Sequence, residues 1–168
     1  NRALQTRSLE EIKVLDPACG AGHILIIAFE KLIALYEAQG KLSESVICQI
    51  LIETLAGCDI DASALWTAAL CLLARAVQAR PPEKARIPFT NFCLALFDVS
   101  SSGESSDGLE LGSLSRSFPS GHPLKEGATI VLANPPYIGR RLLDRRLKKF
   151  LKDEYPNAHH DMSSAFLL

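Results

Sequence analysis

Short apolar runs alternate along the chain with longer segments in which apolar residues recur every three or four positions. The short runs have the length of strands, and we expect strands at 12–15, 56–60, 92–97 and 129–133. The longer segments have the period and length of helices. We expect helices at 23–39, 43–55, 61–78 and 140–152, and the start of another at Ser163.

The ends of these segments carry residues that start and stop helices. Gly40 follows the first helical segment, Ser43 and Asp61 can cap the next two, and Pro81-Pro82 ends the third. Residues 99–127 are rich in Ser and Gly and lack periodicity, so we expect a long loop there. The chain is then one domain, 1–168, of the α/β class, with a parallel sheet and helices on both faces.

Each predicted strand ends near a polar residue. These residues are Asp16, Asp59, Asp98 and Asn134. The carboxyl ends of parallel strands meet at one edge of a sheet, which is where open α/β folds bind ligands. We therefore expect a site at this edge.

Segment 16–22 (D-P-A-C-G-A-G) places two glycines between a strand and a helix. Taken alone, it fits a plain tight turn as well as a loop that approaches a ligand closely. It is not a nucleotide phosphate loop of the Walker type, because no G-K-[ST] follows. A dinucleotide fingerprint would need a third glycine where Leu25 stands.

A cationic nucleoside without phosphates, S-adenosylmethionine, fits these residues better. Asp16 beside the glycine turn can face the ammonium of its amino acid tail, directly or through water. Asp59 can accept from both ribose hydroxyls, because a carboxylate has two acceptor oxygens. Asp98 can accept from the adenine amino group, although a purely structural role at the strand end explains Asp98 equally well.

Asn134-Pro135-Pro136-Tyr137 is the most specific motif in the sequence. Two prolines fix the backbone and remove two donors, so the Asn134 side-chain oxygen and the Pro135 carbonyl can both face a cavity. Together they can accept from the two N–H groups of an exocyclic amine, while Tyr137 offers a flat face for a base. The alternative is a rigid loop with Tyr137 packed on the core.

The motifs D-P-A-C-G-A-G-H, G-C-D-I-D and N-P-P-Y together resemble those of the amino-methyltransferases of restriction–modification and phage-defence systems. The resemblance implies a Rossmann-like methyltransferase fold, S-adenosylmethionine as cofactor, and methylation of the exocyclic amino group of adenine in double-stranded DNA. Restriction or specificity subunits are further partners in such systems. The implied cofactor-binding positions are Asp16, Ala18, Gly20, Gly22, Asp59, Ile60 and Asp98. The implied catalytic positions are Asn134, Pro135, Pro136 and Tyr137.

The sequence departs from the family pattern in two respects. Relatives often carry an acid where Thr129 stands, a change that we expect to affect strand packing rather than chemistry. The family's later strands and target-recognition region are not present, so we expect an incomplete core. Cytosine as the target base, a protein glutamine or RNA substrate, and an inactive methyltransferase-like module remain as alternatives.

Charge adds one candidate surface. The net charge is −1, so no global basic field indicates nucleic acid. Seven basic residues nevertheless follow N-P-P-Y, either as a solvated face or as phosphate contacts. The candidates for phosphate contacts are Arg140, Arg141, Arg145 and Arg146.

Five cysteines lie in apolar runs without a C-x-x-C pair, which is typical of reduced thiols in the cytoplasm. We expect no metal, because the proposed chemistry needs none and His159-His160-Asp161 lies on a predicted loop. We also expect no membrane-spanning segment, since no apolar stretch looks long enough.

Overall fold

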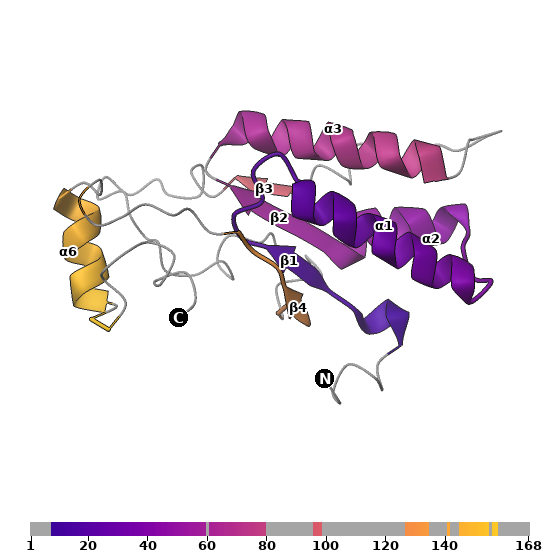
Figure 1. The fold of residues 1–168 in the computed structure, drawn as a ribbon, viewed down its shortest axis with the longest axis horizontal. Coiled ribbons are helices and arrows are strands. Elements are labelled where there is room, and N and C mark those ends of the chain that lie inside the picture. Colours follow the sequence, from indigo (N-terminus) through magenta and orange to yellow (C-terminus); the bar gives the residue numbers. More distant parts are fainter. Residues whose placement is uncertain are drawn as a thin grey trace. The chain divides into compact units, whose positions relative to one another are not determined.

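The computed structural model describes part of the chain in two compact units, Asn1–Ala133 and Asn134–Leu168 (Figure 1). The sheet belongs to the first unit, and helix α6 (Arg145–Glu154) belongs to the second. The described residues are 8–59, 61–79, 96–98, 127–134, 141, 145–154 and 156–157, with 96–98 described by their backbone.

Four parallel strands form the sheet in the order β3-β2-β1-β4. Their bounds are β1 Val14–Asp16, β2 Leu55–Asp59, β3 Leu96–Asp98 and β4 Ile130–Val131. In the register, Val14 of β1 lies opposite both Leu55 and Ile130. The carboxyl ends of the strands therefore meet at one edge, and the predicted parallel α/β sheet is confirmed.

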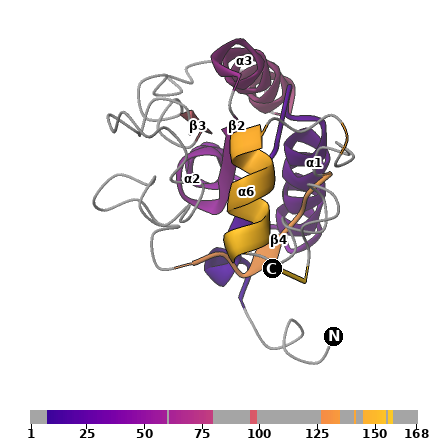
Figure 2. The same cartoon turned by 90° about the vertical axis from the view of Figure 1, so that its left-hand side faces the viewer.

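Helices α1 (His23–Ala38) and α3 (Ala62–Ala79) pack against each other and against the central strands, as both ribbon views show (Figures 1 and 2). Both helices match the prediction closely because each has a run of apolar residues between clear end signals. The core between helices and sheet includes Leu25, Phe29, Leu32, Leu55, Leu65 and Leu72.

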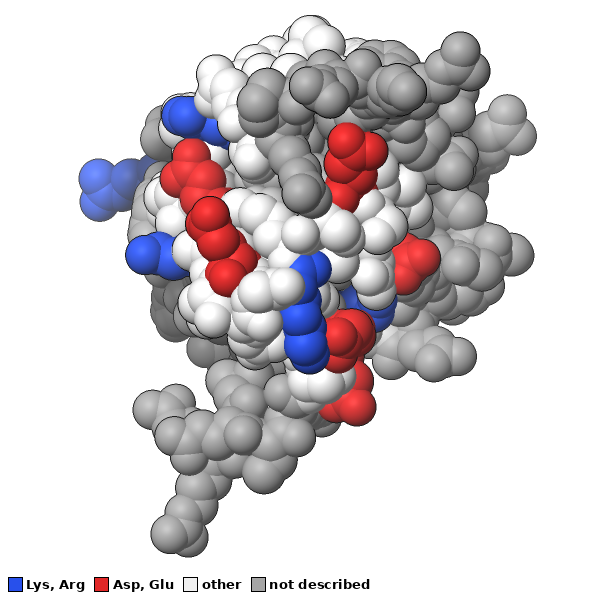
Figure 3. Space-filling view, turned by 90° about the vertical axis from the view of Figure 1, so that its right-hand side faces the viewer, with Lys and Arg blue, Asp and Glu red and all other residues white. Residues whose placement is uncertain are grey.

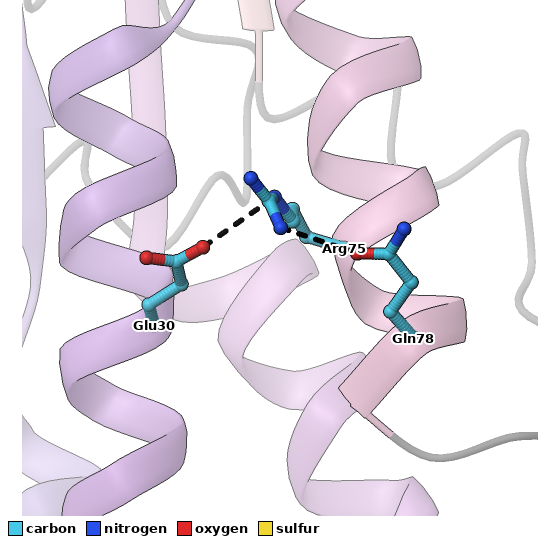
Figure 4. Close-up of polar contacts among 3 residues, drawn as sticks. All are labelled: Glu30, Arg75 and Gln78. Atoms are coloured by element: carbon cyan, nitrogen blue, oxygen red, sulfur yellow. Dashed lines mark hydrogen bonds and ion pairs between the residues drawn. The ribbon is translucent and has the colours of Figure 1, made fainter.

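One ion pair links the two helices at the surface. The Arg75 guanidinium lies 3.4 Å from the Glu30 carboxylate and also donates to Gln78 at 3.2 Å (Figure 4). Each side chain of the pair is 51% exposed, so solvent screens the interaction. We assign the helix packing to the buried apolar residues and not to this pair.

The segment predicted as one helix over 43–55 is two elements. Ser43 caps α2 (Glu44–Gln49) as expected, since its hydroxyl accepts from the Val46 N–H at 3.3 Å. A π-helical turn, Ile50–Thr54, then leads directly into β2. Ile50 and Thr54 are both buried there, so the change of helix type keeps the segment in the core where it joins the sheet.

Strand β4 is shorter than the predicted 129–133, and Thr129 explains where it begins. The Thr129 hydroxyl accepts from the Lys13 N–H at 2.8 Å and donates to the Lys13 carbonyl at 3.0 Å. The N–H groups of Thr129 and Ile130 donate to the same Lys13 carbonyl at 2.9 and 3.0 Å, so the side chain adds to the backbone contacts at this point. Thr129 therefore contributes to the pairing between the segments before β4 and β1. This agrees with the expectation that threonine in place of an acid affects strand packing.

Other boundaries differ from the sequence predictions. Helix α6 begins at Arg145 instead of 140, and β3 is described only over 96–98, ending at Asp98. Most of the predicted loop at 99–127 and the predicted helix start at Ser163 lie outside the described residues.

Helix α3 corrects the prediction that no segment could cross a membrane. Its 18 residues have a mean hydropathy of 1.3, which satisfies length and composition alone. Its inner side is buried against the rest of the first unit through Leu65, Ala68, Ala69, Leu72 and Ala76. Packing in the first unit accounts for this buried side, whereas Trp66, Leu70 and Val77 of the same helix are exposed.

Candidate functional site

The loop from Pro17 to Gly22, called here the glycine loop, joins β1 to α1 at the carboxyl edge of the sheet. Gly20 has φ +52° and Gly22 has φ +82°, both in the left-handed region that strains other residues. The Gly22 N–H donates to the Cys19 carbonyl at 2.8 Å and closes the turn. The two glycines are therefore required by the backbone.

Packing imposes a second requirement at Gly22. A Cβ placed on Gly22 would lie 2.7 Å from the Cβ of Ala68, a buried residue of α3. At Gly20 nothing lies within 4 Å of such an atom. Gly22 thus lets α3 approach the start of α1, whereas Gly20 faces open space.

Asp59 connects the glycine loop to the end of β2. Its Oδ2 accepts from the Gly20 N–H at 2.8 Å, and its Oδ1 accepts from the Asp61 N–H at 3.0 Å. Beside it, the Cys19 N–H donates to the Cys58 carbonyl at 2.9 Å. These bonds join the ends of β1 and β2, although Gly20 and Asp59 are 39 residues apart in the sequence.

Asp16 lies beneath the glycine loop with only 1% of its surface exposed. Its Oδ1 accepts from the Ala18 N–H at 3.1 Å, while Oδ2 has no hydrogen-bond partner in the described part of the chain. Burial raises the pKa of Asp16, and the nearby charge of Asp59 raises it further. A buried carboxylate oxygen without a donor is costly, and a cationic N–H group would relieve that cost.

Two buried thiols lie beside these carboxylates. Burial raises the pKa of Cys19 and of Cys58 to about 12, and the charges of Asp16 and Asp59 add to the effect. Both side chains stay protonated near neutral pH and behave as small apolar groups. The chemistry of this edge therefore does not depend on a thiolate nucleophile.

Four of the backbone N–H groups of the glycine loop are used within the protein. A phosphate-binding loop instead turns several free N–H groups toward its anion. Two carboxylates at the same place make the local charge negative, which suits a cation. The N–H groups that bond internally belong to Ala18, Cys19, Gly20 and Gly22.

The structure brings together five of the predicted cofactor positions at the ends of β1 and β2. They are Asp16, Ala18, Gly20, Gly22 and Asp59. Asp98 ends β3 opposite Asp59 in the strand register. Ile60 lies outside the described residues, and these also include no group of three His, Cys, Asp or Glu side chains arranged to hold a metal.

The predicted catalytic motif is described only at its first residue. Asn134 is exposed and begins the second unit, two residues after Leu132, whose N–H donates to the Leu15 carbonyl of β1 at 2.9 Å. Pro135, Pro136 and Tyr137 lie outside the described residues.

Sequence reasoning missed the part that Ala68 plays. Its small side chain allows the close approach of Gly22. The only sequence signal is an Ala-rich helix, which does not indicate which alanine faces the loop.

Comparison with known families agrees with this geometry. The family of the MmeI DNA-methyltransferase domain matches residues 2–165, nearly the whole chain, so the chain belongs to this family. The family match thus defines the class of protein, a DNA-methyltransferase domain, and the parallel α/β sheet is consistent with it.

Particular relatives are larger proteins. The adenine-specific methyltransferase PglX of Lacticaseibacillus casei (strain Zhang) is 27% identical over 224 residues, covering 98% of this chain and 19% of PglX. The adenine-specific methyltransferase BrxX of Escherichia coli O9:H4 (strain HS) is 47% identical over 68 residues, covering 39% of this chain and 6% of BrxX. The chain thus spans less than a fifth of the length of either protein.

Two solved structures share the fold. A nuclease-deletion mutant of the Type ISP restriction-modification enzyme LlaGI, in complex with a DNA substrate mimic, matches with a TM-score of 0.63 and 19% identity. The match covers 99% of this chain and 15% of LlaGI. The ATP-dependent Type ISP enzyme LlaBIII, bound to DNA, matches with a TM-score of 0.62 and 17% identity, over 98% of this chain and 12% of that one.

Proposed function

We propose that the chain is the catalytic core of a DNA adenine methyltransferase of a restriction–modification or related defence system. Its reaction transfers a methyl group from S-adenosylmethionine to the exocyclic amino group of adenine. The observation that carries the proposal is the pair of carboxylates at the glycine loop, with the Asp16 Oδ2 buried and without a donor. Membership of the MmeI DNA-methyltransferase domain family supports it.

S-adenosylmethionine fits the residues at this edge. Asp16 offers a buried acceptor for the ammonium group, and Asp59 offers acceptor oxygens for the ribose hydroxyls. No atom lies within 4 Å of the position that a Gly20 side chain would take, so the ligand can approach the backbone there. Ala18 and Gly22 complete the loop. Asp98 would accept from the adenine amino group, and Ile60 is a further proposed cofactor-binding position. When bound, S-adenosylmethionine supplies the methyl group on a sulfonium, which is open to direct displacement by an amine.

The target base would be held by the N-P-P-Y motif. The Asn134 side-chain oxygen and the Pro135 carbonyl accept from the two N–H groups of the adenine amine, with Pro136 fixing the backbone between them and Tyr137. Tyr137 stacks on the ring. This arrangement directs the nitrogen lone pair toward the methyl group, so that positioning is the main source of rate. A base in a duplex must first leave the stack, at a cost of a few kcal/mol.

Double-stranded DNA is the proposed partner, together with restriction or specificity subunits, in the cytoplasm. The LlaGI and LlaBIII structures contain a DNA substrate mimic and DNA. Acidic and basic side chains are interspersed on the face of the described residues in Figure 3, so that face offers no basic track for a phosphate backbone. We assign phosphate contacts to the basic segment after N-P-P-Y, through Arg140, Arg141, Arg145 and Arg146.

Methyl transfer to DNA tests the proposal. The chain is incubated with unmethylated duplex DNA and S-adenosylmethionine, and the digested nucleosides are analysed by mass spectrometry. We expect N6-methyladenine with the wild-type chain and none with Asn134→Ala. Methylation of cytosine alone, or equal activity in Asn134→Ala, would contradict the assignment.

A further inference from the structure

Gly20 is held in place differently from Gly22. Packing against Ala68 fixes Gly22, but no atom lies within 4 Å of the side from which a Gly20 side chain would project. The Gly20 N–H donates to the Asp59 Oδ2 at 2.8 Å, and the Gly20 carbonyl accepts a longer contact of 3.6 Å from the thiol of its neighbour Cys19. Both atoms of the bond between Gly20 and Asp59 belong to the protein, so it can form whether or not a ligand is bound.

The same carboxylate has capacity for more donors. A carboxylate offers about four lone-pair positions, and the N–H groups of Gly20 and Asp61 take one on each oxygen. As far as the described residues show, one position on each oxygen is left for a ligand, which matches the two hydroxyls of a ribose. The carboxylate can therefore hold the loop and accept from a ligand at the same time.

Both N–H contacts also fix the orientation of the carboxylate. A side chain that is already oriented loses little conformational freedom when the ligand binds. Asp61 differs, since its own Oδ1 accepts from the Ser63 N–H at 2.9 Å and caps α3 without a contact to the glycine loop. It serves as the matched control.

We propose that Asp59 is a positioning residue for the glycine loop as well as a ligand-binding residue. By holding Gly20, Asp59 keeps the glycine loop in the shape that binds the nucleoside. Loss of Asp59 should therefore weaken binding of the whole nucleoside, not only of its ribose. This inference rests on the proposed S-adenosylmethionine site, but its first half concerns the ligand-free chain.

The first test is amide hydrogen exchange of the ligand-free chain, measured residue by residue by NMR. In Asp59→Ala, we expect exchange of the Gly20 N–H to rise about tenfold or more, since the bond is made to a charged acceptor. In Asp61→Ala, the Gly20 rate stays at the wild-type value. Protected amides in α1 and β1 report that each variant is folded, and Asp59→Asn, which keeps one acceptor oxygen, gives an intermediate rate. A Gly20 rate in folded Asp59→Ala within about twofold of wild type would overturn the proposal.

The second test uses S-adenosylhomocysteine and its 2′,3′-dideoxy analogue, which lacks the hydroxyls. If Asp59 only binds the ribose, Asp59→Ala binds the analogue as tightly as the wild-type chain does, and the positioning role is refuted. We expect instead that Asp59→Ala weakens binding of the analogue by about tenfold. If the wild-type chain binds neither compound, the proposed function fails, while the exchange of Gly20 still decides whether Asp59 holds the loop.

Discussion

Replacing Gly22 by alanine should destabilise the chain far more than the same change at Gly20. Both positions have positive φ, so alanine costs roughly 1–2 kcal/mol at either one. At Gly22 the added methyl would also lie 2.7 Å from the Cβ and 3.1 Å from the Cα of Ala68, closer than Cβ atoms in folded proteins approach, so the two helices would have to shift. Overpacking of this kind costs about 1–3 kcal/mol more.

We therefore expect Gly22→Ala to lower the free energy of unfolding by about 2–5 kcal/mol and Gly20→Ala by about 1–2 kcal/mol. The first loss is large beside the ~5–15 kcal/mol stability of a typical domain. Urea unfolding followed by circular dichroism measures both changes, with an unchanged denaturant slope as the control for two-state behaviour.

The double variant Gly22→Ala/Ala68→Gly tests the cause of the difference. Removing the Ala68 methyl should restore most of the overpacking loss, although a glycine inside α3 itself costs about 1 kcal/mol. The coupling between the two sites should then be about 1 kcal/mol or more and favourable. Equal losses for Gly20→Ala and Gly22→Ala, or no coupling with Ala68, would refute the argument from packing.

Three further outcomes follow from the site and the sheet. The raised pKa of Asp16 means that the folded chain holds this proton to higher pH than the unfolded chain, so this carboxyl lowers stability as pH rises above its ordinary value. The melting temperature of Asp16→Asn should therefore rise relative to that of the wild-type chain as the pH goes from about 4 to about 8. The same variant should bind S-adenosylmethionine about tenfold or more weakly. A constant difference in melting temperature over that range would contradict the predicted effect of the Asp16 charge. With the pKa values of Cys19 and Cys58 at about 12, iodoacetamide should modify exposed Cys71 before Cys19 and Cys58, and mass spectrometry showing Cys19 modified as fast as Cys71 would contradict that order. Thr129→Val should cost about 1–2 kcal/mol in urea unfolding because two hydrogen bonds to Lys13, the residue before β1, are lost, and an unchanged midpoint would show that the hydroxyl is dispensable.

The sequence allowed the sheet and the edge of the site to be predicted because strand ends and glycines are local signals. The sequence predicts that Asp16 and Asp59 lie together, because parallel strands bring their carboxyl ends to one edge of the sheet. The Gly20–Asp59 bond could not be predicted, because it depends on the exact backbone positions of two distant segments. The contact of Gly22 with Ala68 has the same origin.

The limits of element prediction have a similar cause. The π-helical turn before β2 depends on how Ile50 and Thr54 pack in the folded core, which periodicity does not contain. The role of Thr129 depends on its neighbour Lys13, which is far away in sequence. The catalytic assignment of Asn134 to Tyr137 stays a prediction.

The central claim is that the glycine loop with Asp16 and Asp59 binds S-adenosylmethionine. Calorimetric titration of the chain with this compound, beside Asp59→Ala and the control Asp61→Ala, tests it most directly. We predict saturable binding to the wild-type chain and to Asp61→Ala, and none to folded Asp59→Ala. Equal binding to Asp59→Ala, or no binding by the folded wild-type chain, would contradict the account.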